Sequence, residues 1–290
     1  MCRDLKTRFI VNPRSGRVAR ALPAVQDHVR HHGCSLVTTA RAGHAAQLAR
    51  EALDEGCELI VAVGGDGTVN EVGGPLIGTG ALLGLVPCGS GNGLGRHLGI
   101  HGPVSRALGI LREGRPRTID TGVADGHPFL TAAGIGFEAE IAQRFNLLAR
   151  RGFARYVSTT FSTLRSWHAE CLTVVHAGGR DHLRGFSLTV ANANQWGNNA
   201  YIAPRARIDD GQLDLCCLPR LTAWNALPLV TRLFLGSIDR GSGVHSRSGS
   251  RFIVERDSFG PLHTDGEVHS AGTRLEFSIR PASLRIMVPG

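Results

Sequence analysis

The chain of 290 residues contains a single lysine, Lys6, although Lys and Arg together number 32 and the formal net charge is +8. A P-loop that ends in Gly-Lys-Ser/Thr is therefore excluded, because no lysine lies near a glycine-rich stretch. Any cation that binds phosphate in this protein must be an arginine or a metal ion. The basic charge predicts an anionic partner, such as a nucleotide, a nucleic acid or an acidic membrane surface.

Aromatic residues make up only 6% of the chain, and no basic stripe is interleaved with them. Nucleic acid is therefore not an expected partner, because single strands are bound by stacking bases on aromatic rings. No apolar run approaches the ~20 residues of a membrane span, and the N-terminus lacks the apolar stretch of a secretory signal. The seven cysteines have no regular spacing, which predicts free thiols in a reducing cytosol. We therefore expect a cytoplasmic protein.

The first part of the chain alternates short β-branched runs with helical stretches of about ten residues. This pattern predicts an α/β lobe with a parallel sheet that is covered by helices on both faces. Ligands of such sheets bind beyond the carboxyl ends of the strands. Four expected strands are followed by turns at this edge, which begin at Asn12, Thr39, Gly64 and Pro87.

From about Thr118 the pattern changes to strands separated by turn-rich segments, which predicts an antiparallel, β-rich sandwich. One helical region is expected at 138–168 and an exposed loop at 241–250. We expect two domains, 1–122 and 123–290, with the C-terminal tail able to return to the first. The strands expected in this part are 118–123, 129–133, 172–176, 185–191, 213–218, 251–255, 274–279 and 284–288.

A glycine-rich turn, Gly64-Gly65-Asp66-Gly67, follows a buried apolar strand that ends at Val63. The next helix is expected to open at Thr68, with Glu71 in its first turn. Glycines let the backbone approach a phosphate closely, and free N–H groups at a helix start can bind it. Asp66 in this turn could hold Mg²⁺ or accept a proton from an attacking hydroxyl. The alternative is that Asp66 only caps the helix.

A second glycine-rich loop, Pro87-Cys88-Gly89-Ser90-Gly91-Asn92, also lies between an expected strand and an expected helix. Ser90 and Asn92 add hydrogen-bonding side chains to it. Two such loops at one sheet edge suit a polyphosphate better than a single anion. The alternative for this loop alone is a glycine-rich connector.

Together with Asn12-Pro13-Arg14-Ser15-Gly16, the two loops resemble the diacylglycerol kinase catalytic-domain family, which includes bacterial lipid kinases, sphingosine kinases and ceramide kinases. Two later motifs match as well, at 208–214 and 263–267, so the resemblance spans almost the whole chain. The Gly-Gly-Asp-Gly core alone is shared with NAD kinases and phosphofructokinases. The second loop and the late Asp-Gly-Glu motif favour lipid kinases. Relatives often carry a lysine where this chain has Arg14.

The resemblance implies an ATP-dependent kinase, with a nucleotide-binding lobe of the phosphofructokinase and NAD kinase type and a lipid-binding β-rich lobe. It assigns Asp265 as the base that takes the hydroxyl proton and Asp66 as the acid that organises Mg²⁺ and the phosphates. Family members differ over which aspartate takes the proton, so both remain catalytic candidates. The residues implied to bind ATP are Asn12, Thr39, Gly64, Gly65, Asp66, Gly67, Thr68, Val69, Asn70, Glu71, Ser90, Gly91 and Asn92.

The resemblance also implies a structural Mg²⁺ at Arg207, Asp210 and Gln212, held partly through carbonyl oxygens. The alternative for this stretch is an ordinary Asp-Asp-Gly hairpin turn.

The expected activity is transfer of the γ-phosphate of ATP to the hydroxyl of diacylglycerol, a sphingoid base or a related lipid. The alternatives are an NAD kinase-like phosphotransferase and a catalytically silent regulator that binds nucleotide or lipid. Arginines alternate with apolar residues over 138–168, which suits either a helix lying on an anionic bilayer or a packed helix with a solvated arginine face. We expect peripheral association with the inner face of the membrane, and a homodimer is compatible with the sequence.

Overall fold

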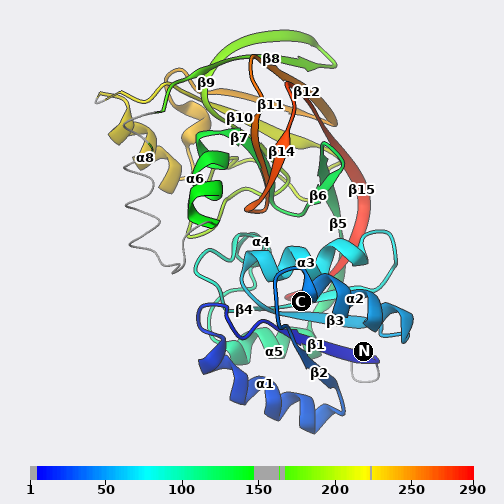
Figure 1. The fold of residues 1–290 in the computed structure, drawn as a ribbon. Helices are drawn as coiled ribbons and strands as arrows, with labels where there is room; N and C mark the ends of the chain where they lie inside the picture. Colours follow the sequence, from blue (N-terminus) through cyan, green and yellow to red (C-terminus); the bar gives the residue numbers. More distant parts are fainter. Residues whose placement is uncertain (1–4, 147–162, 164–166, 223) are drawn as a thin grey trace. The chain divides into compact units, whose positions relative to one another are not determined.

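The computed structural model describes residues 5–146, 163, 167–222 and 224–290. The chain divides into two compact units (Figure 1): unit 1 comprises residues 1–121 and 281–290, and unit 2 comprises residues 122–280. The expected fold class, a parallel α/β part followed by an antiparallel β-rich part, is confirmed.

Unit 1 is built on a parallel sheet in which β1 (Thr7–Val11) lies between β2 (Ser35–Thr38) and β3 (Leu59–Gly64), and β3 pairs in parallel with β4 (Leu82–Pro87). Every residue of β3 is buried, as its unbroken apolar, β-branched sequence predicts.

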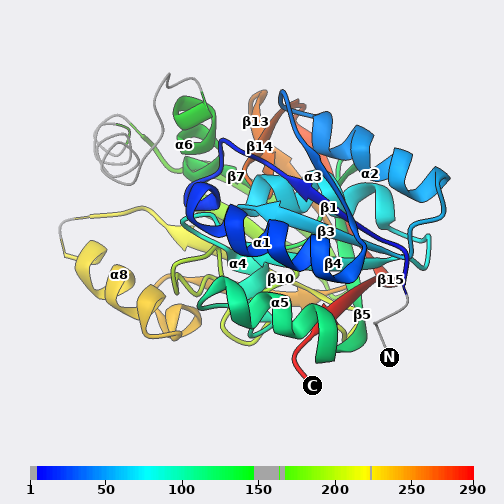
Figure 2. The same cartoon turned by 90° about the horizontal axis from the view of Figure 1, so that it is seen from below.

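Helices cover both faces of this sheet: α2 and α3 lie on one face, and α1 and α5 pack together on the other (Figures 1 and 2). Their apolar stripes recur at helical spacing, which explains why the sequence pattern locates them. The helices of unit 1 are α1 (Val18–His32), α2 (His44–Asp54), α3 (Asp66–Leu76), α4 (Gly93–His97) and α5 (Val104–Glu113).

Unit 2 is antiparallel throughout the pairs described within it. Its main core contains the buried rings Phe129, Phe252 and Phe277. Among the described residues, α6 (Phe137–Asn146), α8 (Ala226–Phe234) and a short 3-10 helix (Ile238–Arg240) accompany the strands. Its strands are β6 (His127–Phe129), β7 (Ala132–Gly136), β8 (Glu170–His176), β9 (Gly179–Ala191), β10 (Leu213–Pro219), β11 (His245–Gly249), β12 (Arg251–Arg256), β13 (Gly260–Thr264) and β14 (Glu267–Ala271).

Two strands belong to both units. β5 (Arg115–Ala124) leaves unit 1, and β15 (Arg274–Val288) returns to it, where it pairs in parallel with β4. The two separate strands expected at 274–279 and 284–288 are therefore one. A bend at Ala282, which has φ of 49°, marks the interruption that the sequence suggested. It is held because the Ala282 N–H donates to Asp120 (2.7 Å).

Two other expectations for unit 2 are wrong. Residues 129–133 do not form one strand: Phe129 ends β6, residues 130–131 form a break, and Ala132 begins β7. The loop expected at 241–250 contains β11, an edge strand paired with β10; its polar sequence His-Ser-Arg-Ser-Gly hides it from apolar patterning. Helix α8 was not expected at all. Of the helical region expected at 138–168, α6 ends at Asn146 and most of the rest lies outside the described residues.

Candidate active site

Three loops of unit 1 pack backbone against backbone after β1, β3 and β4. A Cβ placed on Gly89 would lie 2.6 Å from the Cα of Gly65, and one on Gly16 would lie 2.6 Å from the carbonyl oxygen of Cys88. Real Cβ atoms do not approach so closely, so these positions require glycine. The loops begin where the sequence predicted them. The loop after β1 is joined to the loop after β4 because the Arg17 N–H donates to Cys88 O (2.9 Å).

Asp66 joins the two glycine-rich loops. Its carboxylate accepts the backbone N–H groups of Asn92 (2.8 Å) and Gly93 (2.7 Å) at the start of α4. Asp66 is itself the first residue of α3. It therefore does not only cap that helix, because its carboxylate also binds the neighbouring loop. Burial raises the pKa of Asp66, opposed by these two N–H groups, by the N–H of Asp66 itself and by the charge of Arg96.

Asn92 closes the second loop on itself. Its side chain accepts the N–H of Gly89 (2.9 Å) and donates to the carbonyl of the same residue (2.9 Å). Asn92 takes a left-handed φ of 52°, which asparagine tolerates better than most residues. Ser90 is left exposed at the tip of the loop. In the loop after β1, the Asn12 side chain donates to the Thr68 hydroxyl (3.0 Å), which connects this loop to α3.

The other predicted nucleotide contacts occupy different environments. Since α3 begins at Asp66, Glu71 lies beyond its first turn, and the expectation that it opens the helix is wrong. Its carboxylate instead accepts the N–H of Ala45 (3.1 Å) in the first turn of α2. Val69 and Thr39 are buried, at 7% and 8% exposure. Gly67 is exposed and Asn70 half-buried. Contact of these residues with nucleotide remains a prediction.

Asp265 lies in unit 2, at the two-residue turn between β13 and β14. Asp265 and Gly266 have φ of 50° and 86°, as the tight turns of β-hairpins require. The carboxylate points back at the break between β6 and β7, where it accepts three backbone N–H groups. The donors are Leu130 (2.7 Å), Thr131 (2.9 Å) and Ala132 (3.0 Å). This explains the break at 130–131, because these N–H groups bind a carboxylate instead of a neighbouring strand.

A buried polar cluster supports the same turn. His263 is 7% exposed; its Nδ1 accepts the N–H of Gly266 (3.4 Å), and its Nε2 lies 3.5 Å from Glu138 Oε2. Glu138 Oε1 accepts the hydroxyl of Thr189 (2.7 Å). Glu138 carries no motif and was not predicted. The only sequence signal for Glu138 was an acidic residue in a region of apolar strands and helices.

The loop at 207–212 has the features of a turn. Asp210 accepts the N–H of Gln212 (3.0 Å), Gly211 has a φ of 72°, and Arg207 lies 3.9 Å from Asp209. Across the described ranges, no three His, Cys, Asp or Glu side chains gather into a metal site. A Mg²⁺ here would therefore depend on backbone carbonyls, and this site remains a prediction.

Comparison with known proteins gives the family. A model of the diacylglycerol kinase catalytic domain matches residues 6–124, and a model of the YegS C-terminal NAD kinase beta sandwich-like domain matches residues 131–288. The chain belongs to the YegS-like lipid kinase family. A Pseudomonas aeruginosa protein named "Probable lipid kinase YegS-like" is 32% identical over 85% of this chain and 82% of its own length. A Chromohalobacter salexigens protein of the same name is 29% identical over 91% of this chain and 87% of its own length.

Solved structures agree with the fold of the family. A diacylglycerol kinase from Bacillus anthracis superposes with a TM-score of 0.77 at 22% identity, over 98% of this chain and 96% of that protein. An NAD kinase from Archaeoglobus fulgidus in complex with ATP superposes with a TM-score of 0.57 at 11% identity, over 97% of this chain and 93% of that protein. At these identities the likeness concerns the fold.

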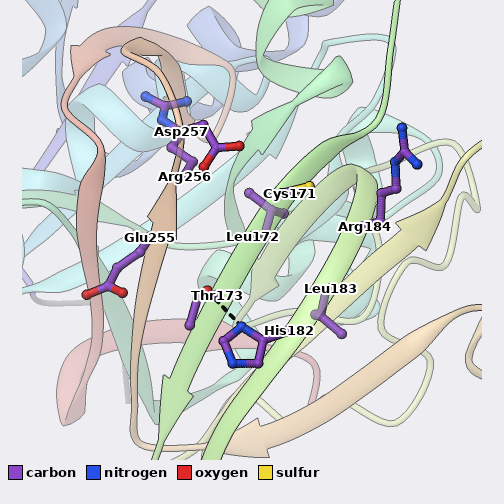
Figure 3. A pocket seen from close by; sticks show the side chains of 9 residues that line it. All are labelled: Cys171, Leu172, Thr173, His182, Leu183, Arg184, Glu255, Arg256 and Asp257. Atoms are coloured by element: carbon purple, nitrogen blue, oxygen red, sulfur yellow. Dashed lines mark hydrogen bonds between the residues drawn. The ribbon is translucent and has the colours of Figure 1, made fainter.

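Unit 2 also has a surface hollow that contains none of the motif residues. The hollow, of about 480 Å³, lies on β8, β9 and the end of β12 (Figure 3) and contains no residue that the sequence marked as functional. Arg256 at its edge is buried and donates to the carbonyls of Gly260 (2.7 Å) and Ala271 (3.0 Å). Its charge therefore supports the β13–β14 hairpin. In the part of the chain that the structure describes, no helix has the length and apolar character needed to cross a membrane.

Proposed function

We propose that this protein is an ATP-dependent lipid kinase that transfers the γ-phosphate to the hydroxyl of diacylglycerol, a sphingoid base or a related lipid. Its place in a lipid kinase family gives the reaction class, a phosphotransferase. The observation that carries the nucleotide assignment is the contact between Gly65 and Gly89, where two glycine-rich backbones meet without room for a side chain.

In this proposal the glycine loops of unit 1 bind the phosphates through backbone N–H groups near the start of α3. Asp66 holds the two loops together, since its carboxylate spans from α3 to the start of α4. Each of its oxygens accepts one backbone N–H, and a carboxylate oxygen can accept a second partner. The residues therefore also fit a contact with Mg²⁺, which neutralises charge on the transferred phosphate when bound.

Asp265 is the proposed acceptor of the hydroxyl proton. Phosphoryl transfer depends on positioning more than on covalent chemistry, so a base must be held in a fixed orientation. The three N–H groups of Leu130, Thr131 and Ala132 fix this carboxylate. The same anchoring would serve a purely structural turn, and mutation must separate the two roles. We propose that the enzyme works at the cytoplasmic face of a membrane, where ATP and a lipid acceptor are both present.

The NAD kinase-like alternative is favoured by one observation, the structural likeness to an NAD kinase solved with ATP. The named relatives and the matching C-terminal family model favour lipid. A catalytically silent regulator would retain the glycine-rich loops and bind nucleotide or lipid, but it would not transfer phosphate.

The test is transfer of labelled γ-phosphate from ATP with Mg²⁺ to a panel of acceptors: diacylglycerol, sphingosine, ceramide, phosphatidylglycerol and NAD. Label in a lipid, lost in Asp265→Asn, supports the proposal and identifies the acceptor. Label in NAD alone would replace it with the soluble-nucleotide alternative. ATP binding without transfer to any acceptor would favour the regulator.

A further inference from the structure

Helix α8 of unit 2 carries an unusual concentration of exposed apolar side chains. Of the six large hydrophobic residues that are exposed among those described, five lie within residues 224–235, and the sixth is Phe259. We name these five the α8 face. They are Trp224 (91% exposed), Leu227 (74%), Val230 (48%), Phe234 (51%) and Leu235 (74%).

The helix is nevertheless firmly seated in unit 2 by its opposite side. Leu229 is 5% exposed, and Leu233 packs against the buried cluster that contains Ile202 and Ala203. Leu227, Val230 and Phe234 follow one another at spacings of three and four, so they share a side of the helix. The helix is therefore apolar on two sides, and only one of them has a partner within the described residues.

The polar groups close to the α8 face do not oppose burial in an apolar phase. Thr231 lies among these residues on the helix, and its hydroxyl donates to the carbonyl of Leu227 (2.9 Å). The backbone of the helix is hydrogen-bonded internally. Inserting this side into hydrocarbon would therefore leave few unpaired polar groups.

Charge indicates which apolar phase the α8 face suits. Residues 215–238 contain two charged side chains, Arg220 and Arg232, and no Asp or Glu. Asp239, on the 3-10 helix in contact with α8, is paired with Arg205. Arginines beside an apolar helix face attract anionic lipid headgroups. Tryptophan is enriched at membrane–water interfaces, and Trp224 precedes the first turn of the helix.

Size argues against a protein partner as the occupant. A helix of nine residues is about 14 Å long at 1.5 Å per residue. A stable protein interface buries about 800 Å² on each partner, far more than one side of so short a helix offers. Insertion into a bilayer needs only an apolar face that reaches about 5–10 Å below the headgroups.

We propose that the α8 face docks this protein on an anionic lipid bilayer, with its apolar side chains among the acyl chains and Arg220 and Arg232 at the headgroups. The inference builds on the proposed function, since a lipid kinase must reach an acceptor held in a membrane. It assigns the contact to a surface other than the basic segment at 138–168 that the sequence suggested.

The test is sedimentation of the full-length protein with vesicles made of equal parts phosphatidylglycerol and phosphatidylcholine, in the absence of ATP. The double variant Leu227→Ser/Phe234→Ser should bind roughly a hundredfold more weakly than the wild type, because each of the two insertions contributes about a factor of ten. Phe259→Ser is the matched control: it removes an even more exposed ring of unit 2 (81%) outside the α8 face and should bind like the wild type. Arg232→Gln should weaken binding to these vesicles and leave binding to pure phosphatidylcholine unchanged.

A second readout does not depend on substitution of the helix. Trp224 should be quenched by brominated acyl chains in the wild type, and the quenching should be lost in Trp224→Phe, in which Trp167 and Trp196 remain. Unchanged vesicle binding by the double variant, or quenching that persists in Trp224→Phe, would overturn the proposal. Loss of a dimer in the double variant, measured by analytical ultracentrifugation, would assign the face to a second copy and overturn it as well.

These results are separable from the proposed function. Phosphate transfer to a short-chain, water-soluble acceptor should be equal in the wild type and the double variant if the α8 face serves only docking, and a loss of this activity would contradict that role. Vesicle binding through α8 without any kinase activity would keep the inference and remove the proposed function. Kinase activity together with vesicle binding that does not depend on α8 would keep the proposed function and remove the inference about α8.

Discussion

Asp265 is fixed to the backbone of Thr131, whose amide nitrogen lies 2.9 Å from Oδ1 of the carboxylate. The two residues are 134 positions apart in the chain, so the contact joins the β13–β14 hairpin to the break between β6 and β7. The backbone N–H of Asp265 completes the link by donating to Ala132 O (2.8 Å). The orientation of the proposed base is therefore set by backbone groups, which mutation of neighbouring side chains cannot easily remove.

We expect Asp265→Asn to lower the rate of phosphate transfer by roughly 10²–10⁴-fold, the usual effect of losing a general base. ATP affinity should change little. The amide NH₂ would also face backbone N–H groups, which should cost about 1–3 kcal/mol in the free energy of unfolding. Steady-state kinetics, ATP titration and urea unfolding measure the three quantities.

The chain provides a matched control for this variant. Asp125 and Gly126 form a similar Asp-Gly turn between β5 and β6, with φ of 49° and 86°, and Asp125 is exposed. Asp125→Asn should leave both rate and stability unchanged, because Asn-Gly suits such turns. A near-normal rate in Asp265→Asn would remove this residue from the base role and leave it as a structural turn.

Asp66→Asn should weaken ATP binding by at least tenfold, because an amide can accept from only one of the N–H groups of Asn92 and Gly93 and opposes the other with its own NH₂. Calorimetric titration with ATP measures the change. Asp54→Asn, at the exposed end of α2, is the control and should bind like the wild type. Equal affinities in all three proteins would contradict the loop-joining role.

The Asp66 carboxyl also gives a pH dependence. Burial raises its pKa above the usual carboxyl value, so the folded state binds this proton more tightly than the unfolded state does. The associated stability is fully present below the unfolded pKa of about 3.9 and is lost as pH rises through the folded pKa. The free energy of unfolding of the wild type should therefore fall relative to that of Asp66→Asn over this window. Urea unfolding at a series of pH values measures the difference, and parallel curves would contradict the shift.

Gly89→Ala tests the contact between the two glycine loops. The new Cβ would lie 2.6 Å from Gly65 Cα and 2.9 Å from Asn92 Oδ1, so the loops must separate. We expect a loss of about 1–3 kcal/mol in the free energy of unfolding, as for overpacking, and at least tenfold weaker ATP binding.

Gly109→Ala serves as its control. Gly109 lies inside α5, and a Cβ there meets nothing within 4 Å. Because glycine is unfavourable in helix interiors, the substitution should stabilise the protein by about 0.5–1 kcal/mol and leave ATP binding intact. If Gly89→Ala behaved in the same way, the close packing of the loops would not matter for nucleotide binding.

The sequence predicted those parts of the fold that are determined by neighbouring residues in the chain. The unbroken apolar run of β3 and the glycines at 64–67 and 89–93 mark a buried strand and close backbone approach without knowledge of the rest of the chain. The start of α3 was placed too late, because Asp66 and Gly67 carry no helical periodicity and glycine disfavours helix. The partner of Glu71 was equally hidden, since the Ala45 N–H lies in another helix.

The contacts within unit 2 were less accessible to sequence reasoning. The motif at 263–267 identified Asp265, but nothing local shows that its carboxylate binds residues 130–132. β11 is a polar edge strand whose pairing depends on β10. Helix α8 escaped because its apolar residues lie on two sides, so the sequence lacks the alternation of apolar and polar faces by which helices are recognised.

Glu138 tests whether the buried cluster positions the Asp265 turn. In Glu138→Gln the charge facing His263 Nε2 is lost, while the volume and the contact with Thr189 are kept. We expect kcat to fall by about tenfold, on the scale of a weakened hydrogen bond to a charged group, with the KM for ATP unchanged because the nucleotide loops belong to unit 1. Glu140→Gln, which breaks the ion pair with Arg144 on the same helix, should alter none of these values, because such partly exposed pairs contribute little. An equal loss in both variants, or a parallel rise in the KM for ATP, would mean that α6 acts on the overall fold instead of on the Asp265 turn.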